Sequence, residues 1–568
     1  MKFLSGYDFN PIHIDISVKN FITEGLFLGK GRQALEIVVL RSQEKPNSKL
    51  IQQIFNKRRD GRAAPILLVI IFPKGITLCG TNGTQPPIYE LKDLNQVERL
   101  CASALNKPDR NTAISYLSNT IPSLETELPG FRNEGFLSFN ELIKGPKKRK
   151  DWEYASNKGH LVLEKKRDEI FENFGFTSKK LDNYTNLLTY NEERIALGII
   201  LSEDEIPNAA SSRFNNISPI NYAFIKADNE NLSWILLIQE DRVRLYNTRN
   251  IGVGRRNRTE TYIESQISII ASEDAGLLWL LFSGEALREE GTIFNILEDS
   301  KRFAASIAER LRERIYEIVI PKLTLGISKA RHLINPEKKE TELTYEMALT
   351  VLFRLLFIAY AEDRDLLPYK NNEFYKKRSL KQKAIELAEA STKKIPISKG
   401  YHHWNETISL WDSVSKGNKE WGVPAYGGTI FSNDPKIYQA GAELDKISLE
   451  NEYFEEALRY LLLSESKENE YSPIDFRSLS VREFGTIYEG LLVSELSLAN
   501  QNLTIDKDNN YLPAREGEKI IVMKGDTYLH NRSGARKSSG SYYTPDFAVE
   551  HLLDEALEPA IKKHFEKL

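Results

Sequence analysis

The chain has 568 residues, which is enough for about three or four domains of ~150 residues. Its composition, 41% hydrophobic and 28% charged, excludes a disordered, fibrous or membrane-embedded chain. The formal net charge of -3 gives no overall attraction to nucleic acid but is compatible with local basic faces. The N-terminus lacks the basic start, apolar core and cleavage site of a secretion signal, so we expect a cytoplasmic protein with no membrane partner.

Cysteine usage and the most apolar segment both favour an ordinary folded interior. Cys79 and Cys101 are too few for a metal-binding set or a disulfide scaffold, so we expect two buried thiols. The segment 347–361, "MALTVLFRLLFIAYA", is hydrophobic on nearly every side, contains Arg354, and is shorter than the ~20 residues that a bilayer requires. It predicts a helix in a protein core.

The first half of the chain predicts two α/β modules, residues 1–175 and 176–291. In the first, the apolar runs 64–72 and 76–80 are separated by Pro-Lys-Gly, which is typical of two strands joined by a tight turn. The runs 234–239 and 242–246 repeat this pattern in the second. The two modules are therefore candidates for a repeat, and the second is a candidate for a degenerate nuclease-like fold.

From residue 292 to 498 the pattern becomes mainly helical. Apolar residues recur at helical spacing from Ser300 onward and predict a long amphipathic helix that ends near Pro321. Further helices are predicted at 345–363, 380–390, 453–463 and 481–496.

Residues 499–568 are polar and rich in turn-forming residues. They predict two short strands at 519–523 and 527–531, and then an amphipathic helix after Thr544 and Pro545. The apolar face of this last helix would consist of Val549, Leu552, Leu553, Ala556 and Leu557.

Four motifs in the second half resemble a known family. They are "FRLLFIAYAEDRDLLP" at 353–368, "VPAYGGTIF" at 423–431, "LSVREFGTIYEGLLVSEL" at 479–496 and "RKSSGSYYTP" at 536–545. In this order they resemble the motifs of large Type IIG restriction-modification enzymes and of related adenine-N6 DNA methyltransferases in phage-defence systems such as DISARM and BREX. The N-terminal half resembles some defence-associated members more loosely.

The resemblance implies S-adenosylmethionine as cofactor and double-stranded DNA as partner. Paired tyrosines and a Thr-Pro turn at a helix start can cover an adenine ring, and a glycine lets the backbone approach a ligand. By resemblance, the segment before the cofactor-binding fold supplies the cofactor contacts Gly540, Ser541, Tyr542, Tyr543, Thr544 and Pro545.

The chain departs from the family at the catalytic motif, so no catalytic residue is assigned. Methyl transfer to a flipped adenine requires an Asn or Asp before Pro-Pro and an aromatic residue, and none of the 568 residues forms that motif. The single Pro-Pro lies at 86–87 after Gln85. "FLGKG" at 27–31 matches the form of the cofactor loop but precedes the Tyr-Tyr-Thr-Pro segment, whereas the family's loop follows it.

Two Glu-x-Lys patterns are candidates for a metal-dependent nuclease site. Glu90 and Lys92 follow Asp60, and Glu164 and Lys166 follow Asp151. Because residues 161–175 favour a helix rather than a strand, no metal ligands are assigned. "YHHWNE" at 401–406 places two histidines beside a glutamate without a clear third ligand, which favours a structural role.

Three basic clusters are candidates for contacts with the DNA backbone, which add affinity without reading sequence. They are Lys57, Arg58, Arg59 and Arg62; Lys147, Lys148, Arg149 and Lys150; and Arg255, Arg256 and Arg258.

The sequence thus predicts α/β N-terminal modules, a mainly α-helical connector, and a chain that ends at the start of a Rossmann-like methyltransferase domain. We expect the N-terminal part of an S-adenosylmethionine-dependent DNA adenine-N6 methyltransferase, which grips DNA or partners and covers the cofactor. The alternatives are a DNA-binding or scaffold subunit that docks on a separately encoded catalytic chain or other defence-system subunits, and a metal-dependent nuclease.

Overall fold

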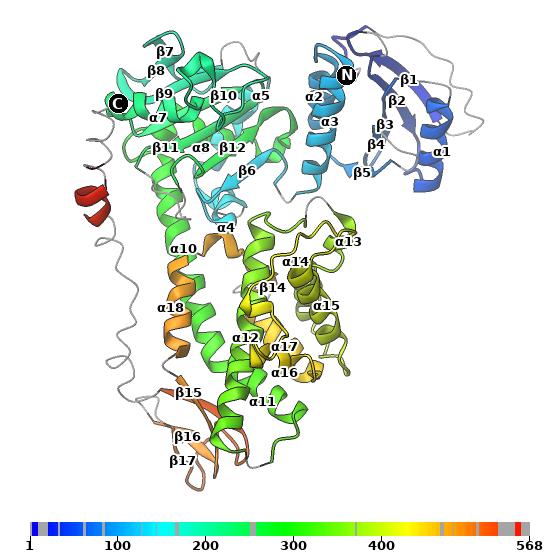
Figure 1. The fold of residues 1–568 in the computed structure, drawn as a ribbon. Coiled ribbons are helices and arrows are strands. Elements are labelled where there is room, and N and C mark those ends of the chain that lie inside the picture. The colour runs from blue at the N-terminus through cyan, green and yellow to red at the C-terminus, as the bar shows by residue number, and fades with distance from the viewer. Residues whose placement is uncertain are drawn as a thin grey trace. The chain divides into compact units, whose positions relative to one another are not determined.

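The structure is a computed structural model, and it divides into two compact units, Met1–Arg302 and Phe303–Leu568 (Figure 1). Each unit has hydrophobic cores of its own. The residues that the structure describes are 3–8, 21–31, 34–60, 64–81, 86–126, 128–143, 145–164, 170–249, 257–334, 336–369, 372–465, 471–479, 481–492, 494–506, 511–531, 551–557 and 560.

A five-stranded mixed sheet organises the start of the first unit, with helices on both faces. The strands lie in chain order, and the helix α1 covers one face while α2 and α3 cover the other. The bounds are β1 (Phe21–Leu28), β2 (Glu36–Ser42), α1 (Ser48–Arg59), β3 (Ile66–Phe72), β4 (Gly75–Thr81), β5 (Ile88–Leu91), α2 (Leu94–Leu105) and α3 (Arg110–Thr120). The predicted pair of strands around Pro73 is confirmed as β3 and β4.

A seven-stranded mixed sheet organises the rest of the first unit, in the order β6-β12-β11-β10-β9-β8-β7. The predicted pair around Glu240 is confirmed as β10 and β11, which are antiparallel. The strands are β6 (Phe131–Glu134), β7 (Thr177–Lys180), β8 (Thr185–Tyr190), β9 (Glu193–Leu201), β10 (Trp234–Gln239), β11 (Arg242–Asn247) and β12 (Tyr262–Gln266). The helices are α4 (Phe139–Ile143), α5 (Trp152–Glu164), α6 (Ile170–Asn173), α7 (Pro219–Asn229), α8 (Gly276–Phe282) and α9 (Gly284–Leu287).

The two sheets contain the same run of five strands, which supports the predicted repeat. In β1 to β5 a hairpin is followed by the crossover helix α1, a strand parallel to β2 and two further antiparallel strands. In β8 to β12 the directions are identical, with α7 as the crossover helix. The second sheet differs by adding β7 and β6 at its two edges.

The second unit is mainly helical, as the helical pattern from residue 292 predicts. α10 (Thr292–Arg314) leads into it, and the remaining helices are α11 (Ile320–Ala330), α12 (Lys338–Asp363), α13 (Glu373–Lys376), α14 (Leu380–Thr392), α15 (His402–Lys416), α16 (Gln439–Leu444), α17 (Asn451–Leu462) and α18 (Val481–Leu492). The short strands β13 (Leu463–Glu465) and β14 (Tyr471–Pro473) pair with each other.

The expected helix end near Pro321 was wrong, because the helix continues through a π turn. Residues Ile315–Val319 form a π-helical segment, and α11 follows at once with Pro321 in its first turn. Proline lacks an N–H and its ring crowds the preceding turn, so a wide turn just before it relieves the clash. The helical path therefore runs on to Ala330.

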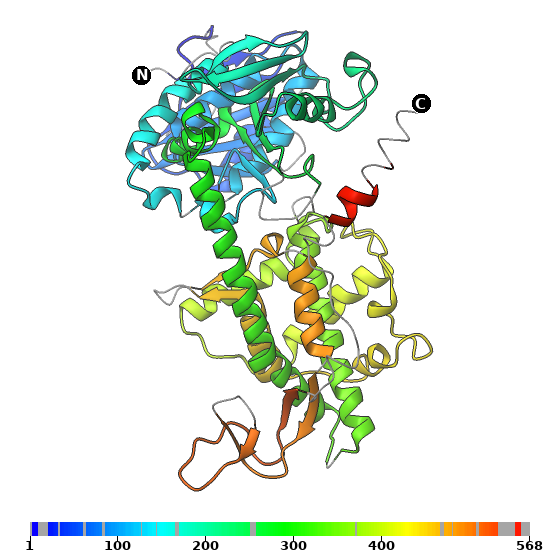
Figure 2. The ribbon, with the colours of Figure 1, turned by 90° about the vertical axis from the view of Figure 1, so that its left-hand side faces the viewer.

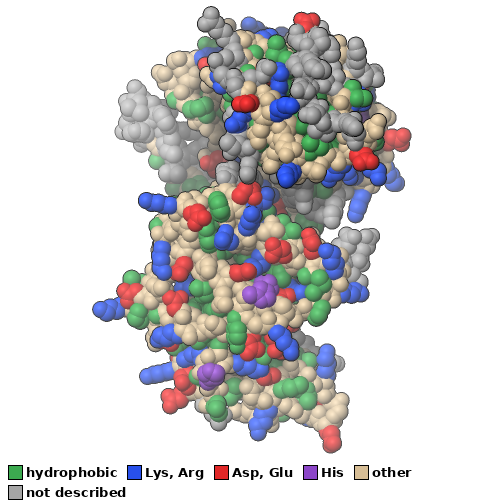
Figure 3. All heavy atoms as spheres, turned by 90° about the vertical axis from the view of Figure 1, so that its right-hand side faces the viewer, with side chains coloured by type: hydrophobic (Ala, Val, Ile, Leu, Met, Phe, Trp, Pro, Cys, Tyr) green, Lys and Arg blue, Asp and Glu red, His purple; other side chains and the backbone are tan. Residues whose placement is uncertain are grey.

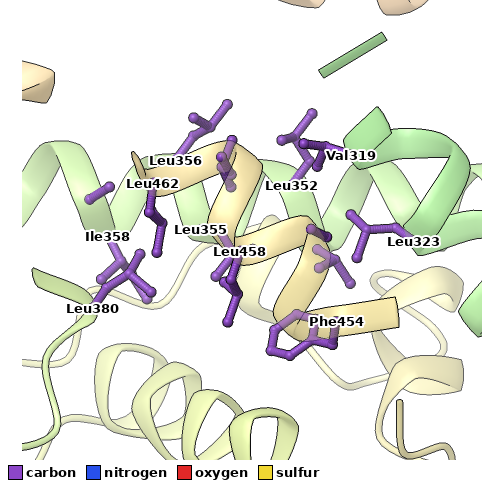
Figure 4. Packing of buried hydrophobic residues seen from close by; sticks show 14 of the residues in the cluster. Val319, Leu323, Leu352, Leu355, Leu356, Ile358, Leu380, Phe454, Leu458 and Leu462 are labelled. Atoms are coloured by element: carbon purple, nitrogen blue, oxygen red, sulfur yellow. The ribbon is translucent and has the colours of Figure 1, made fainter. Parts of the chain in front are cut away.

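α12 is the central helix of this unit. Figure 4 shows side chains of α12, including Leu352 and Leu355, packed with Leu458 and Leu462 of α17. α12 is long and apolar enough to cross a membrane by length and composition, but most of it is buried by its neighbours. The prediction of a core helix at 347–361 is confirmed.

The segment after α18 forms small antiparallel pairs. β15 (Ser494–Leu498) pairs with β18 (Thr527–Asn531), and β16 (Leu503–Ile505) pairs with β17 (Tyr511–Pro513). The predicted strand 527–531 is confirmed. The predicted strand 519–523 is wrong, because only Val522 forms a single bridge there and positive-φ glycines at 517 and 525 turn the backbone on both sides. The predicted helix 481–496 ends at Leu492, where pairing with β18 takes over.

Candidate functional site

The cofactor segment predicted from resemblance, Gly540 to Pro545, lies outside the residues that the structure describes. The other three motifs lie within the second unit and are almost wholly described. Although they are separated by tens of residues in sequence, they meet around α12. This meeting point is the candidate functional site.

Arg354 of the first motif holds the backbone of the second motif. Its guanidinium is 2% exposed, and its Nε donates to the carbonyl oxygen of Ile430 at 2.7 Å. The same group stacks over Trp411 at 4.9 Å from the ring centroid. Burial lowers the pKa of Arg354, but the hydrogen bond and the aromatic contacts compensate part of the desolvation. Arg354 therefore fixes the Gly-Gly-Thr-Ile-Phe loop against α12.

The acidic pair at the end of the first motif caps neighbouring backbone. Glu362 is 1% exposed and accepts hydrogen bonds from the backbone N–H groups of Leu380 and Lys381 at the start of α14. Its burial raises its pKa to about 7. Asp363 accepts from the backbone N–H of Phe476 at 2.8 Å. Both carboxylates thus satisfy helix or turn N–H groups, which is a structural use of acidic side chains.

The third motif forms α18, which runs alongside α12 (Figure 2). Phe484 contacts Tyr360, and Tyr488 contacts Phe353, with ring centroids 5.5 Å apart in both pairs. The hydroxyl of Tyr345 donates to the carbonyl oxygen of Leu491 at 2.7 Å. Because later α18 residues meet earlier α12 residues, the two helices are antiparallel.

The three motifs together form one half-exposed aromatic surface. Residues 353, 357 and 360 fall on one stripe of α12 because their spacing is helical. Phe357 is 37% exposed, Tyr426 40% and Tyr488 42%, although each ring also contacts a neighbouring ring. The aromatic surface consists of Phe353, Phe357, Tyr360, Tyr426, Phe484 and Tyr488. Sequence reasoning missed it, although the spacing in the first motif was a usable signal.

Comparison with known proteins adds no identification. No protein-family model matches this sequence. No curated protein and no solved structure matches it either. Function is therefore inferred from the residues themselves and from the motif resemblance.

The first basic cluster belongs partly to the interior of its module. Arg58 is 7% exposed and pairs with the equally buried Glu36, with 2.7 Å between Nη2 and the carboxylate. Arg58 thus joins the end of α1 to the start of β2. Lys57 and Arg59 flank it at the end of α1, and Arg62 lies outside the described residues.

The second basic cluster offers the more exposed cations. Lys148 and Lys150 are exposed, whereas Lys147 pairs with the buried Asp274 at 2.6 Å and Arg149 binds Asp151 through two hydrogen bonds of 2.9 Å. A surface lysine of this kind can reach a phosphate without loss of a buried partner.

In the third basic cluster, Arg255 and Arg256 lie outside the described residues. Arg258 pairs with Asp228 at 2.9 Å and lies over the ring of Phe224. It therefore has a local structural role beside α7.

The candidate nuclease carboxylates Asp151 and Glu164 lie at opposite ends of one helix. Asp151 precedes α5 and Glu164 ends it, so the two are separated by about 20 Å along one helix. Glu90, on the edge strand β5, pairs with the exposed Lys45 at 2.7 Å. Within the described ranges, no group of three or more His, Cys, Asp or Glu side chains is placed to hold a metal ion. The separation of Asp151 from Glu164 thus gives no support to that Glu-x-Lys pattern as a two-strand metal site.

The other candidates also have structural surroundings. The side-chain amide Nδ2 of Asn451 donates to Nδ1 of His402 at 2.7 Å, and His403 lies 3.3 Å from Glu455, so both rings tie α15 to α17. Cys79 and Cys101 are buried, as expected, and burial raises the pKa of Cys79 to about 12. "FLGKG" begins in β1 and leads into the antiparallel strand β2, so it is not the strand-to-helix turn that holds a cofactor phosphate or ribose.

Proposed function

We propose that this chain is the recognition and scaffold portion of an S-adenosylmethionine-dependent DNA adenine-N6 methyltransferase of a restriction-modification or antiviral defence system. The α/β modules contact double-stranded DNA or protein partners, and the helical unit carries the segment 540–545 that covers the cofactor. The catalytic groups that hold the flipped adenine come from a methyltransferase domain outside these residues. The setting is cytoplasmic, where host and phage DNA are both accessible.

One observation carries this proposal: motifs that follow the family's order in sequence also share one packing site. Arg354 links the first motif to the second, and the ring contacts of Phe353 and Tyr360 link the first to the third. A chance match of short patterns gives no reason for such mutual contacts. This supports a common architecture for the helical unit.

The charge distribution favours the α/β unit as the side that contacts DNA. Figure 3 shows acidic and basic side chains interspersed on the visible face of the helical unit, without a large patch of one sign. In the first unit, Lys148 and Lys150 are exposed on either side of Arg149 in one turn-rich segment. Phosphate contacts of this kind supply affinity that falls steeply with salt.

The test is a pair of titrations on the full chain. Calorimetry with S-adenosylmethionine, with and without a short DNA duplex, should show no tight cofactor binding by the chain alone. In the second titration, the logarithm of the binding constant for the duplex should fall linearly with the logarithm of the salt concentration. Tight cofactor binding without added protein would overturn the assignment of catalysis to another domain. Duplex binding that does not depend on salt, or none at all, would overturn the DNA-contacting role.

A charge-matched comparison locates the DNA-binding surface. The double variant K148A/K150A should reduce the salt slope by up to ~1.8, because each lysine that neutralises a phosphate adds about 0.9 to the slope. The control K338A/K339A removes two lysines at the start of α12 and should leave the slope unchanged. Equal slopes for both variants would reject the second basic cluster as the DNA-binding surface.

A further inference from the structure

The aromatic surface leaves apolar rings open to solvent on a unit that has a well-packed core. Phe357, Tyr426 and Tyr488 each expose more than a third of their area, and Leu366, whose carbonyl accepts from Tyr426, is 56% exposed. Large apolar side chains that gather on one face usually mark a contact with another segment or protein. The question is which partner covers this face.

The same unit contains a second set of uncovered apolar side chains. Residues 551–557 are helical, with a π turn over Leu553–Leu557, and Leu552 is 61% exposed and Leu553 is 47% exposed. The sequence places Val549, Ala556 and Leu557 on the same face of an amphipathic helix. A single short helix of this kind is not stable in water unless its apolar face packs on something.

We propose that the amphipathic segment 546–557 docks its leucine face on the aromatic surface of α12 and α18. The inference stands on the exposure of the two faces and does not depend on the proposed methyltransferase function. It commits to an intramolecular contact within the second unit. A second copy of the chain and a separate partner are the competing occupants.

The chain connectivity places the segment within reach of the surface. Asn531, at the end of β18, pairs with Ser494, which lies two residues after the end of α18. The helical rise gives about 18 Å along α12 from Tyr345, which contacts the end of α18, to Phe357. The 19 residues 532–550 span up to ~60 Å when extended, so the connection is long enough.

The dimensions of the two faces also match. As a regular α-helix, the segment 546–557 would be about 18 Å long, and the aromatic stripe from residue 353 to residue 360 covers about 10 Å of α12. Apolar side chains at positions 549, 552, 553 and 556 would lie over two turns of that stripe. This is the helix-in-groove mode of recognition, in which residues at i, i+3, i+4 and i+7 form the contact.

Cysteine crosslinking tests the proposal directly. The natural Cys79 and Cys101 are buried, so an F357C/L552C variant presents two exposed thiols for a short bismaleimide reagent. The matched control D412C/L552C places the first thiol on α15, where Asp412 is similarly exposed. We expect an internal crosslink that forms at least tenfold faster in F357C/L552C and at a rate independent of protein concentration.

Two outcomes oppose the proposal. Equal rates for the two pairs, or crosslinked dimers whose yield rises with concentration, would overturn the intramolecular contact. A second measurement does not depend on correct folding of the double cysteine variants. Maleimide should label the thiol of the variant F357C at least threefold faster when the same chain also carries L552D and L553D. Unchanged labelling of Cys at 357 in that background, with an intact far-UV spectrum, would also overturn the proposal.

Discussion

Replacement of Arg354 tests whether the sequence motifs are bound together by the contacts around α12. Arg354→Ala removes the buried guanidinium that joins α12 to the Ile430 carbonyl and that lies over Trp411. The loop 423–431 then loses its main polar attachment to the helix. The perturbation is confined to the second unit, so its effect on stability can be read from one unfolding transition.

The expected loss of stability is about 3 kcal/mol. A hydrogen bond from a charged group is worth roughly 1.5–3 kcal/mol, and a desolvated cation–π contact adds about 2 kcal/mol. One contribution opposes this loss. Burial of the charged guanidinium costs desolvation free energy, which is also why burial lowers the pKa of Arg354, and truncation removes that cost. Truncation also leaves a cavity beside Phe431 and an unpaired carbonyl at Ile430, so the destabilising contributions exceed that relief.

Chemical denaturation followed by tryptophan fluorescence is the assay. Trp404, Trp411 and Trp421 report on this unit, and the other three tryptophans lie in the first unit, so the transition that Arg354→Ala shifts is the one to measure. The control is Arg364→Ala just after the end of the same helix, where the less buried Arg364 lies over the ring of Tyr360 and the loss should stay below about 1 kcal/mol. Arg354→Met keeps the volume and removes the charge. Wild-type stability in Arg354→Met would refute the reasoning, since it would show that packing alone attaches the loop.

Other predictions concern pH and packing. Burial raises the pKa of Glu455, but hydrogen bonds from His403 and Arg459 outweigh the effect of burial and lower that pKa to about 2. The stabilising effect of the Glu455 carboxylate is therefore present above about pH 4.5 and lost as pH falls toward 2, and Glu455→Gln should reduce this loss of stability in a series of denaturation measurements at low pH. Burial raises the pKa of Glu362 to about 7, so between about pH 4.5 and 7 the folded state keeps a proton that the unfolded chain has lost. The free energy of unfolding therefore falls as pH rises through this range, and Glu362→Gln should remove this pH dependence. Gly159→Ala should lower the free energy of unfolding by about 1–3 kcal/mol or more, because an added Cβ would overlap the carbonyl oxygen of Ala275; an unchanged melting temperature would contradict this close packing of α5 on α8.

The sequence predicted much of the local structure because hydrophobic periodicity reports burial directly. Alternating and continuous apolar runs located β3, β4, β10 and β11, and the apolar segment 347–361 marked the core helix. It misjudged the helix at Pro321, because a proline usually ends a helix, whereas here the π turn at Ile315–Val319 accommodates it and the helical path continues. The strand β15 was missed for a similar reason, since its partner β18 lies about thirty residues later.

The candidate site was harder to predict because its residues are brought together only by tertiary packing. Nothing in the sequence shows that Phe484 and Tyr488 lie beside Tyr360 and Phe353. In the basic clusters, the residues are neighbours in sequence but do not share a role. Their like charges suggested contacts with DNA, whereas Arg58 forms a buried ion pair within its module. Local charge is therefore a weak guide wherever a carboxylate from a distant element can neutralise it.

The contacts within the motifs also change what the family resemblance means. Arg354, Glu362 and Asp363 bind backbone groups of neighbouring segments, which is the chemistry of a scaffold rather than of catalysis. A resemblance carried by such residues argues for a shared helical framework more strongly than for a shared reaction. Three rings of the aromatic surface, Phe357, Tyr426 and Tyr488, remain partly exposed in addition to their contacts within the framework. The test of what covers these rings therefore bears most directly on how the framework contacts the segment 546–557.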